Sequence, residues 1–221
     1  GLPRDVTGYD GTLSPLHRDV LLAVSRYEDL DEATARAQVD RARAVYAAIP
    51  TPNLDGTTGI VLHVRWTDPV PRSGFGAWWT VGDRMLRREE RGLAHWLQIT
   101  TGGGGQAQQT GDMGGAGAHW AAFAHELGHQ LSLSHEGDSA PAWCPLYPSL
   151  MNYAFNYQLG GDGNAIRFSD GRFASVELRE TALPERLPFP LAELKYLQAA
   201  PFRFTLAADG DGATRIDWNH D

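Results

Sequence analysis

The sequence has a single cysteine, Cys144, among its 221 residues, so an intrachain disulfide bond is excluded. It also lacks an apolar run of the roughly eighteen residues that cross a bilayer, and we therefore expect no membrane span. Basic side chains are in the minority: 19 Lys and Arg against 27 Asp and Glu give a formal charge of −8. Nucleic-acid binding needs a basic surface, so we expect no nucleic-acid partner. No charged-then-apolar leader is present, and we expect any secretion signal or propeptide to have been removed from this sequence.

The rest of the composition is that of a globular protein, because 42% of the residues are hydrophobic and 21% are charged. A chain of this length buries one good core. We therefore predict a single domain over residues 1–221, divided by a cleft into two lobes.

In the first half of the chain, short apolar segments that predict strands alternate with a segment that has helical periodicity. Three strands are predicted, at residues 19–24, 59–64 and 96–100. Residues 31–49 predict a helix, because apolar positions recur there at spacings of three and four. Asp31 is the expected N-cap, and Pro50 and Pro52 force the helix to end. This alternation favours an α+β fold in which helices pack on a mixed sheet.

A glycine-rich stretch interrupts this pattern at residues 102–117. We interpret it as a flexible surface loop; the alternative is that it forms the rim of an active site, since it leads directly into the next helix. Beyond about residue 137 the chain is rich in Pro, Gly and aromatic residues, and only short helices are predicted there, at 174–180 and 191–198.

Residues 118–131 predict a helix that carries two histidines. Its large or apolar residues fall within one arc: Trp120, Phe123, Ala124, Leu127 and Leu131. His125 and His129 lie on the opposite side, about 40° apart and one turn along. Two imidazoles on one rigid element suit a metal ion, and Glu126 beside them is placed to act on a metal-bound water. The pattern His-Glu-x-x-His therefore predicts a zinc site.

His135 is the expected third ligand. On a continuing helix it would be rotated about 120° from His129 and could not reach the same ion. The chain must therefore leave the helix near residues 131–133 and turn back. Three protein ligands with one open position are the catalytic arrangement of zinc, whereas a structural site takes four ligands, often cysteines.

The residues His125-Glu126-Leu127-Gly128-His129-Gln130-Leu131-Ser132-Leu133-Ser134-His135 resemble the long zinc motif of the metzincin clan of metallopeptidases. Downstream, Ser149-Leu150-Met151-Asn152-Tyr153 resembles the methionine turn of that clan. Residues 52–64 and 216–219 are similar to segments of bacterial secreted, reprolysin-like members. The resemblance is strong only between residues 118 and 155.

The resemblance implies a secreted, monomeric zinc endopeptidase that acts on protein or peptide substrates. The expected fold has an upper lobe at 1–135, which carries the zinc helix, and an irregular lower lobe at 136–221. Glu126 would be the general base, and Met151 would form an apolar floor under the site. Tyr153 has the position of a tyrosine that, in astacin- and serralysin-like members, approaches zinc as a fifth ligand and stabilises the transition state. The alternative for Tyr153 is a packed aromatic side chain.

Ser132 departs from the clan pattern, which has glycine where the zinc helix breaks. Glycine adopts a left-handed conformation there without steric strain. A serine in that conformation would be strained by about 1 kcal/mol; otherwise the turn has a different local geometry.

Three other interpretations remain open. A gluzincin would take its third ligand from a later helix, at Glu177 or Glu180, which the methionine turn disfavours. A peptide deformylase would need a cysteine upstream of the motif, whereas Cys144 lies downstream. A non-catalytic module would keep zinc for stability only, and it would have no reason to retain Glu126.

The C-terminal tail offers alternating oxygen ligands suited to calcium, a second candidate cofactor, at residues 209–212 and 217–221. It ends before the glycine and distal Glu of an EF-type loop. The remaining histidines fit no ligand spacing and are expected to be structural or exposed: His17, His63, His95, His119 and His220.

Overall fold

The computed structural model describes seven stretches of the chain: residues 8–72, 78–135, 147, 149–153, 168–169, 205–208 and 214–217. The chain divides into two compact units, Gly1–Ser134 and His135–Asp221. No helix in these described stretches is long and apolar enough to cross a membrane.

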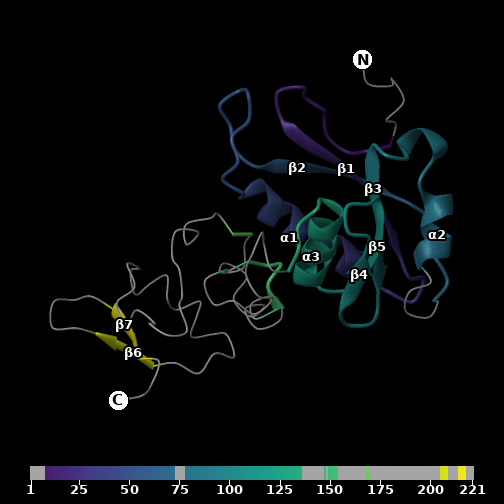
Figure 1. The fold of residues 1–221 in the computed structure, drawn as a ribbon. Helices are drawn as coiled ribbons and strands as arrows, with labels where there is room; N and C mark the ends of the chain where they lie inside the picture. The colour runs from purple at the N-terminus through teal and green to yellow at the C-terminus, as the bar shows by residue number, and fades with distance from the viewer. Residues whose placement is uncertain are drawn as a thin grey trace. The chain divides into compact units, whose positions relative to one another are not determined.

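The first unit is built on a five-stranded mixed sheet with the order β2-β1-β3-β5-β4 (Figure 1). Its strands are β1 (Arg18–Arg26), β2 (Ile60–Trp66), β3 (Ala94–Thr100), β4 (Gly105–Ala107) and β5 (Met113–Gly117). Neighbouring strands pair in parallel, except that β4 pairs antiparallel with β5 at one edge. The predicted α+β architecture and the three predicted strands are therefore confirmed, with β4 and β5 as additions.

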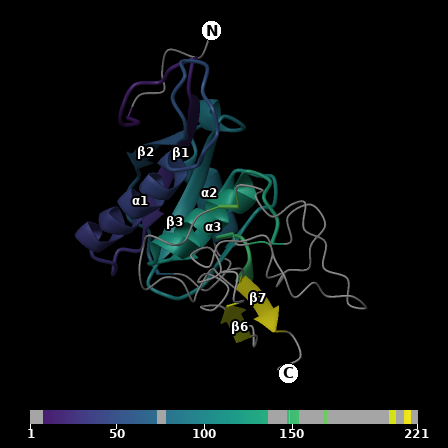
Figure 2. The same cartoon turned by 90° about the vertical axis from the view of Figure 1, so that its left-hand side faces the viewer.

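Three α-helices and one 3-10 turn accompany this sheet: α1 (Glu32–Ala47), α2 (Trp78–Met85), η1 (Arg88–Glu90) and α3 (Trp120–Gln130). Helices α1 and α3 lie side by side (Figures 1 and 2) and are joined by a hydrogen bond of 2.9 Å from the Tyr46 hydroxyl to the Ala124 carbonyl oxygen. Trp78 of α2 belongs to a separate core cluster with Leu21 and Trp96. Leu22, which alternates with Leu21 along β1, is also fully buried, so both faces of this strand are covered.

Helix α1 forms as the sequence predicts. The Asp31 carboxylate accepts a hydrogen bond of 2.8 Å from the backbone N–H of Thr34, which satisfies an amide at the helix start. Four positions at helical spacing are buried: Ala35, Val39, Ala42 and Tyr46. The helix ends at Ala47, three residues before Pro50.

The interpretation of residues 102–117 as a flexible loop is wrong, because this stretch contains β4 and β5. Its glycines allow close packing of backbones. A β-carbon on Gly114 would lie 3.0 Å from the Ala107 Cα, and one on Gly117 would lie 3.1 Å from the Gly103 Cα. Glycine composition here reflects strand packing and not chain flexibility.

The described part of the second unit contains one antiparallel strand pair, β6 (Thr205–Ala208) with β7 (Thr214–Asp217). The helices predicted at 174–180 and 191–198 lie outside the described residues. The same holds for Cys144, for Glu177 and Glu180, and for the calcium ligands proposed at 209–212 and 218–221.

Candidate metal centre

The helix that carries the first two histidines begins at Trp120, two residues later than predicted. His119 is its N-cap, and the His119 Nδ1 atom accepts a hydrogen bond of 3.2 Å from the backbone N–H of Ala121. The backbone N–H of Trp120 donates to the Gln38 Oε1 atom of α1 at 2.9 Å. Ten of the eleven residues of α3 are buried, so the helix is enclosed on nearly all sides and does not have one packed and one open face.

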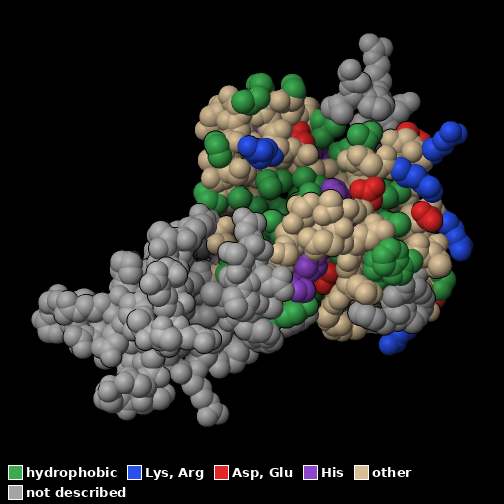
Figure 3. Space-filling view, in the orientation of Figure 1, with side chains coloured by type: hydrophobic (Ala, Val, Ile, Leu, Met, Phe, Trp, Pro, Cys, Tyr) green, Lys and Arg blue, Asp and Glu red, His purple; other side chains and the backbone are tan. Residues whose placement is uncertain are grey.

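The predicted metal ligands come together. Side-chain nitrogen atoms of His125, His129 and His135 lie within 4.8 Å of one another. His125 is only 2% exposed, whereas the other two are partly exposed. Figure 3 shows histidine side chains reaching the surface on the side of the molecule that it presents. Three imidazoles at this spacing can hold a metal ion.

The chain leaves α3 by a left-handed turn, as the position of His135 requires. Ser132 has a φ of 75°, so the serine does adopt the strained left-handed conformation. Its backbone N–H donates to the His129 carbonyl oxygen at 3.0 Å, and the N–H of Leu133 donates to the Gly128 carbonyl oxygen at 2.9 Å. These two bonds form a Schellman motif, which ends the helix and redirects the chain towards His135.

The imidazole of His129 is held by two oxygen atoms. Its Nδ1 atom lies 2.8 Å from the Leu133 carbonyl oxygen and 3.0 Å from the Gln109 Oε1 atom. Burial lowers the pKa of His129, and the hydrogen bond to Leu133 opposes this shift. Both of these oxygen atoms are acceptors, so Nδ1 carries the hydrogen and Nε2 is the unprotonated nitrogen of the ring. That tautomer is the one a metal ligand needs.

Glu126 is buried, and no described residue supplies a counter-charge to it. It is 4% exposed, and its Oε2 atom has no hydrogen-bond partner among the described residues. Burial raises the pKa of Glu126 to about 8, since the charged form is poorly solvated there. The backbone of β4 approaches it closely: a β-carbon on Gly105 would lie 2.7 Å from the Glu126 Cδ atom. A carboxyl group in this state responds strongly to any positive charge placed beside it.

The predicted methionine turn is a turn in the structure. The backbone N–H of Asn152 donates to the Ser149 carbonyl oxygen at 2.9 Å, and the N–H of Met151 donates to the Ser149 Oγ atom at 3.2 Å. Met151 is fully buried. The ring of Tyr153 packs on that of His135, with centroids 4.0 Å apart. Tyr153 is therefore a packed aromatic side chain with His135 as its partner. Its role as a metal ligand stays a prediction.

Four of the remaining five histidines are described, and each contacts other groups. The Nδ1 atom of His63 lies 2.8 Å from the Asp10 carbonyl oxygen, and that of His95 lies 3.1 Å from the Gln130 Oε1 atom. His17 pairs with Asp55 at 2.6 Å, and His119 is the helix cap. Within the described stretches, only His125, His129 and His135 form a group of three metal-binding side chains.

Two contributors to the site were missed in the sequence. Gln109 contacts His129 from a position twenty residues earlier, and Gly105 makes room for Glu126. Both lie in the glycine-rich stretch, for which the rim of an active site was the alternative interpretation. That interpretation named no residue, and no local pattern indicates which positions contact α3. Only the pairing of β4 with β5 brings them to the helix.

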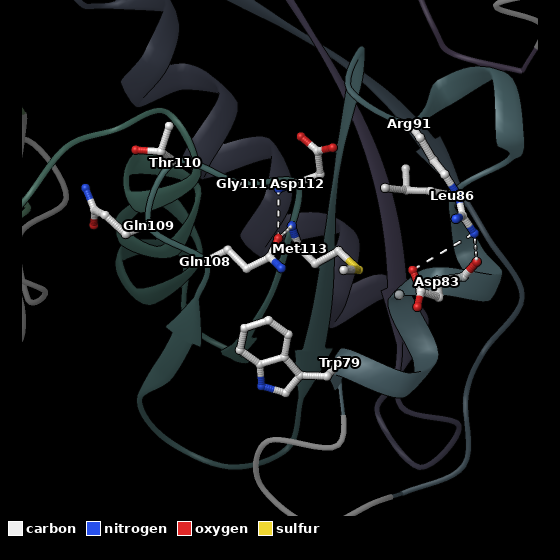
Figure 4. Close-up of a pocket in the computed structure, with 11 residues that line it drawn as sticks. Trp79, Asp83, Leu86, Arg91, Gln108, Gln109, Thr110, Gly111, Asp112 and Met113 are labelled. Carbon is white, nitrogen blue, oxygen red and sulfur yellow. Dashed lines mark hydrogen bonds and ion pairs between the residues drawn. The ribbon is translucent and has the colours of Figure 1, made fainter.

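A cavity of about 530 Å³ is lined by residues of α2 and of the turn between β4 and β5 (Figure 4). Trp79 and Asp83 of α2 and Leu86 just after it line one side of the cavity, and Gln108 and Met113 line the other. The Gln108 Oε1 atom accepts from the backbone N–H groups of residues 112 and 113, at 3.0 and 3.1 Å. Gln108 thus stabilises the turn itself.

No protein-family model matches the chain, and no curated protein is detectably similar to it. The interpretation of the site therefore depends on its chemistry alone. Three imidazoles fit a bound divalent cation because they supply neutral nitrogen ligands. Glu126 adjoins them in the sequence and has no counter-charge among the described residues, so the cation would stabilise its ionised form.

Proposed function

We propose that the chain is a zinc-dependent endopeptidase of the metzincin type. The observation that carries this proposal is the convergence of three histidine side chains beside a buried glutamate whose Oε2 atom has no hydrogen-bond partner among the described residues. Nitrogen ligands of this kind suit zinc, and three of them leave a position for water or substrate. A glutamate that follows the first histidine directly is the general base in peptidases with this pattern.

The roles of the protein groups follow from their positions. A bound zinc ion would polarise the scissile carbonyl group and lower the pKa of a water molecule to about 7. His125, His129 and His135 would hold the ion as neutral imidazoles. Glu126 would accept a proton from the attacking water and return it to the leaving amine. Its enclosed position limits exchange of that proton with solvent.

Further parts of the proposal rest on the metzincin resemblance. Met151 would lie beneath the metal ligands, and Tyr153 would donate a hydrogen bond to the developing oxyanion. The substrate would be a protein or peptide, and the enzyme a secreted monomer. Its fold would be the catalytic domain of that clan.

The test combines metal content with cleavage. The purified chain should contain one zinc ion and cleave casein or fluorogenic peptides, lose cleavage on chelation and regain it with zinc. The Glu126→Gln variant should retain zinc and cleave about 10²–10⁴-fold more slowly. Zinc bound without cleavage of a broad peptide library would instead support a non-catalytic module, and undiminished cleavage by the variant would refute the proposed role of Glu126.

The ligand set is tested separately. His135→Ala should lose most zinc affinity, whereas Glu177→Ala and Glu180→Ala should retain it. The opposite pattern would favour the gluzincin interpretation.

A further inference from the structure

We propose that Gln109 is a positioning residue of the metal centre, which fixes the imidazole of His129 in its metal-binding tautomer and secures the turn that leads to His135. This inference rests on the proposed metal site and is independent of the reaction performed there. It assigns a role to a side chain from the β4–β5 turn, outside the zinc motif.

The contacts form a closed set of three groups. The Gln109 Oε1 atom lies 3.0 Å from the His129 Nδ1 atom, and the Gln109 Nε2 atom donates to the Leu133 carbonyl oxygen at 3.2 Å. The same carbonyl oxygen lies 2.8 Å from the His129 Nδ1 atom. The carbonyl of Leu133 can only accept, so the Gln109 amide nitrogen faces it and the amide oxygen faces His129. The Gln109 side chain therefore contacts both His129, a proposed metal ligand, and the segment that leads to His135, the next proposed ligand.

The backbone of the turn is fixed to the same helix residue. The N–H of Thr110 donates to the His129 carbonyl oxygen at 3.0 Å. Thr110 has a φ of 56°, a left-handed conformation that a β-branched residue adopts only when its surroundings hold it there. This backbone bond keeps the Gln109 side chain next to His129, which reduces the entropy lost when the side chain binds.

The contact has a direct consequence for metal binding. An oxygen acceptor at Nδ1 fixes the ring orientation, places the hydrogen on Nδ1 so that Nε2 is unprotonated, and makes the imidazole a better electron donor to a metal. Gln109 itself is exposed, so water competes for its hydrogen bonds. We therefore expect an effect near the lower end of the range for such outer partners, about tenfold in metal affinity.

The turn does not depend on Gln109 for its own conformation. The Gln108 side chain accepts from two N–H groups of the turn, and the Gln108 N–H donates to the Met113 carbonyl oxygen at 2.9 Å. Substitution of Gln109 removes none of these bonds. A Gln109→Ala variant should therefore fold, and its metal-free form should melt within a few degrees of the unmodified protein.

The experiment measures the zinc dissociation constant by competition with a fluorescent chelator at pH 7.5. Gln109→Ala should bind zinc about tenfold more weakly. Gln109→Glu retains an acceptor for Nδ1 and should stay within about threefold of the unmodified protein. Gln106→Ala, which removes an exposed glutamine of β4, is the matched control and should have no effect.

Equal zinc affinity of Gln109→Ala and Gln106→Ala would overturn the whole assignment. An equal loss in the Ala and Glu variants at position 109 would overturn the role of the Nδ1 acceptor, because Glu keeps that acceptor and loses only the donor to Leu133. Both require that the unmodified protein binds zinc. Failure of that binding would instead refute the proposed metal site, so the two failures are distinguishable.

Discussion

Two buried glutamates of the first unit have nearly the same exposure and opposite surroundings. Glu90 is 3% exposed and Glu126 is 4% exposed. One carboxylate oxygen of Glu90 lies 2.6 Å from the Arg65 Nη2 atom and accepts from the backbone N–H of Arg87 at 2.8 Å. No such partner reaches the Oε2 atom of Glu126 within the part of the chain that the structure describes, and its pKa is raised to about 8.

The difference separates a carboxylate that the fold compensates from one that the described residues leave uncompensated. A buried charge is unfavourable unless a partner compensates it. Arg65 provides that compensation for Glu90 within the fold. Glu126 can avoid a buried charge in two ways. It can stay protonated, or a cation bound beside it can compensate its charge, and the neighbouring histidines can supply ligands for such a cation. An uncompensated carboxyl next to metal-binding side chains is a candidate for proton transfer.

The largest effect on stability is expected at the compensated glutamate. Glu90→Gln leaves the guanidinium of Arg65 buried without its counter-charge, so the free energy of unfolding should fall by about 3–5 kcal/mol. Urea denaturation of the metal-free protein measures this loss. In the double variant with Arg65→Met, part of the stability should return because no unpaired charge remains. A loss below about 1 kcal/mol in the single variant would show that the pair does not stabilise the fold.

At Glu126 the substitution by Gln should not destabilise the fold. It should instead remove a dependence of the free energy of unfolding on pH. Because the pKa of Glu126 is about 8 in the folded, metal-free protein and ordinarily 4.5, the folded state holds this proton more tightly than the unfolded state. The associated stability is fully present below pH 4.5, declines as the pH rises to about 8 and then stays constant. Over that window the unmodified protein should lose a few kcal/mol relative to Glu126→Gln, which has no such proton.

Parallel unfolding curves at pH 5, 6.5 and 8 in the presence of chelator measure this difference. If the two proteins had the same pH dependence, Glu126 would be ionised in the metal-free fold. The contrast with Glu90 would then be lost.

The space around Glu126 can be tested through β4. A β-carbon at position 105 would lie 2.5 Å from the Glu126 Cγ atom, so Gly105→Ala must displace the carboxyl group. Peptide cleavage should fall by about tenfold or more with zinc retained, because displacement of a reactive group by 1 Å is enough for such a loss. Gly103→Ala is the matched control, since an added β-carbon there meets nothing within 4 Å. Equal activity of the two variants would mean that Glu126 adapts without functional loss.

The fold was predictable where local pattern and tertiary packing agree. Helix α1 has its cap at Asp31 and its buried positions at regular spacing, and it forms within two residues of the predicted bounds. Helix α2 was missed, because its eight residues are too few to show a period and include a glycine. Gly82 allows α2 to pack closely on β3, because a β-carbon at this position would lie 2.9 Å from Trp96. Such long-range contacts have no signal in the local sequence.

The site was predictable as far as the helix geometry extends. His125 and His129 follow from the one-turn spacing, and the helix break near residues 131–133 follows from the expectation that His135 is the third ligand. Gln109 and Gly105 depend on strand pairing between β4 and β5, which brings them to α3 from a glycine-rich segment. The near-complete burial of α3 was also not predictable, because the polar His125 and Glu126 have the pattern of a solvent-facing side.

The smallest effect is expected at the turn that follows this helix. Ser132 has a φ of 75°, where a β-carbon is strained by about 1–2 kcal/mol and glycine is not. Ser132→Gly should therefore stabilise the metal-free protein, by about 0.5–1 kcal/mol after the greater freedom of glycine in the unfolded chain is subtracted. Thr101→Gly, at an exposed position with ordinary φ, should instead destabilise it slightly. Destabilisation by both variants, measured by urea denaturation, would mean that the Ser132 side chain contributes more to the turn than its strained backbone removes. Contacts of the Ser132 side chain at the C-terminal end of α3 would then outweigh the backbone strain.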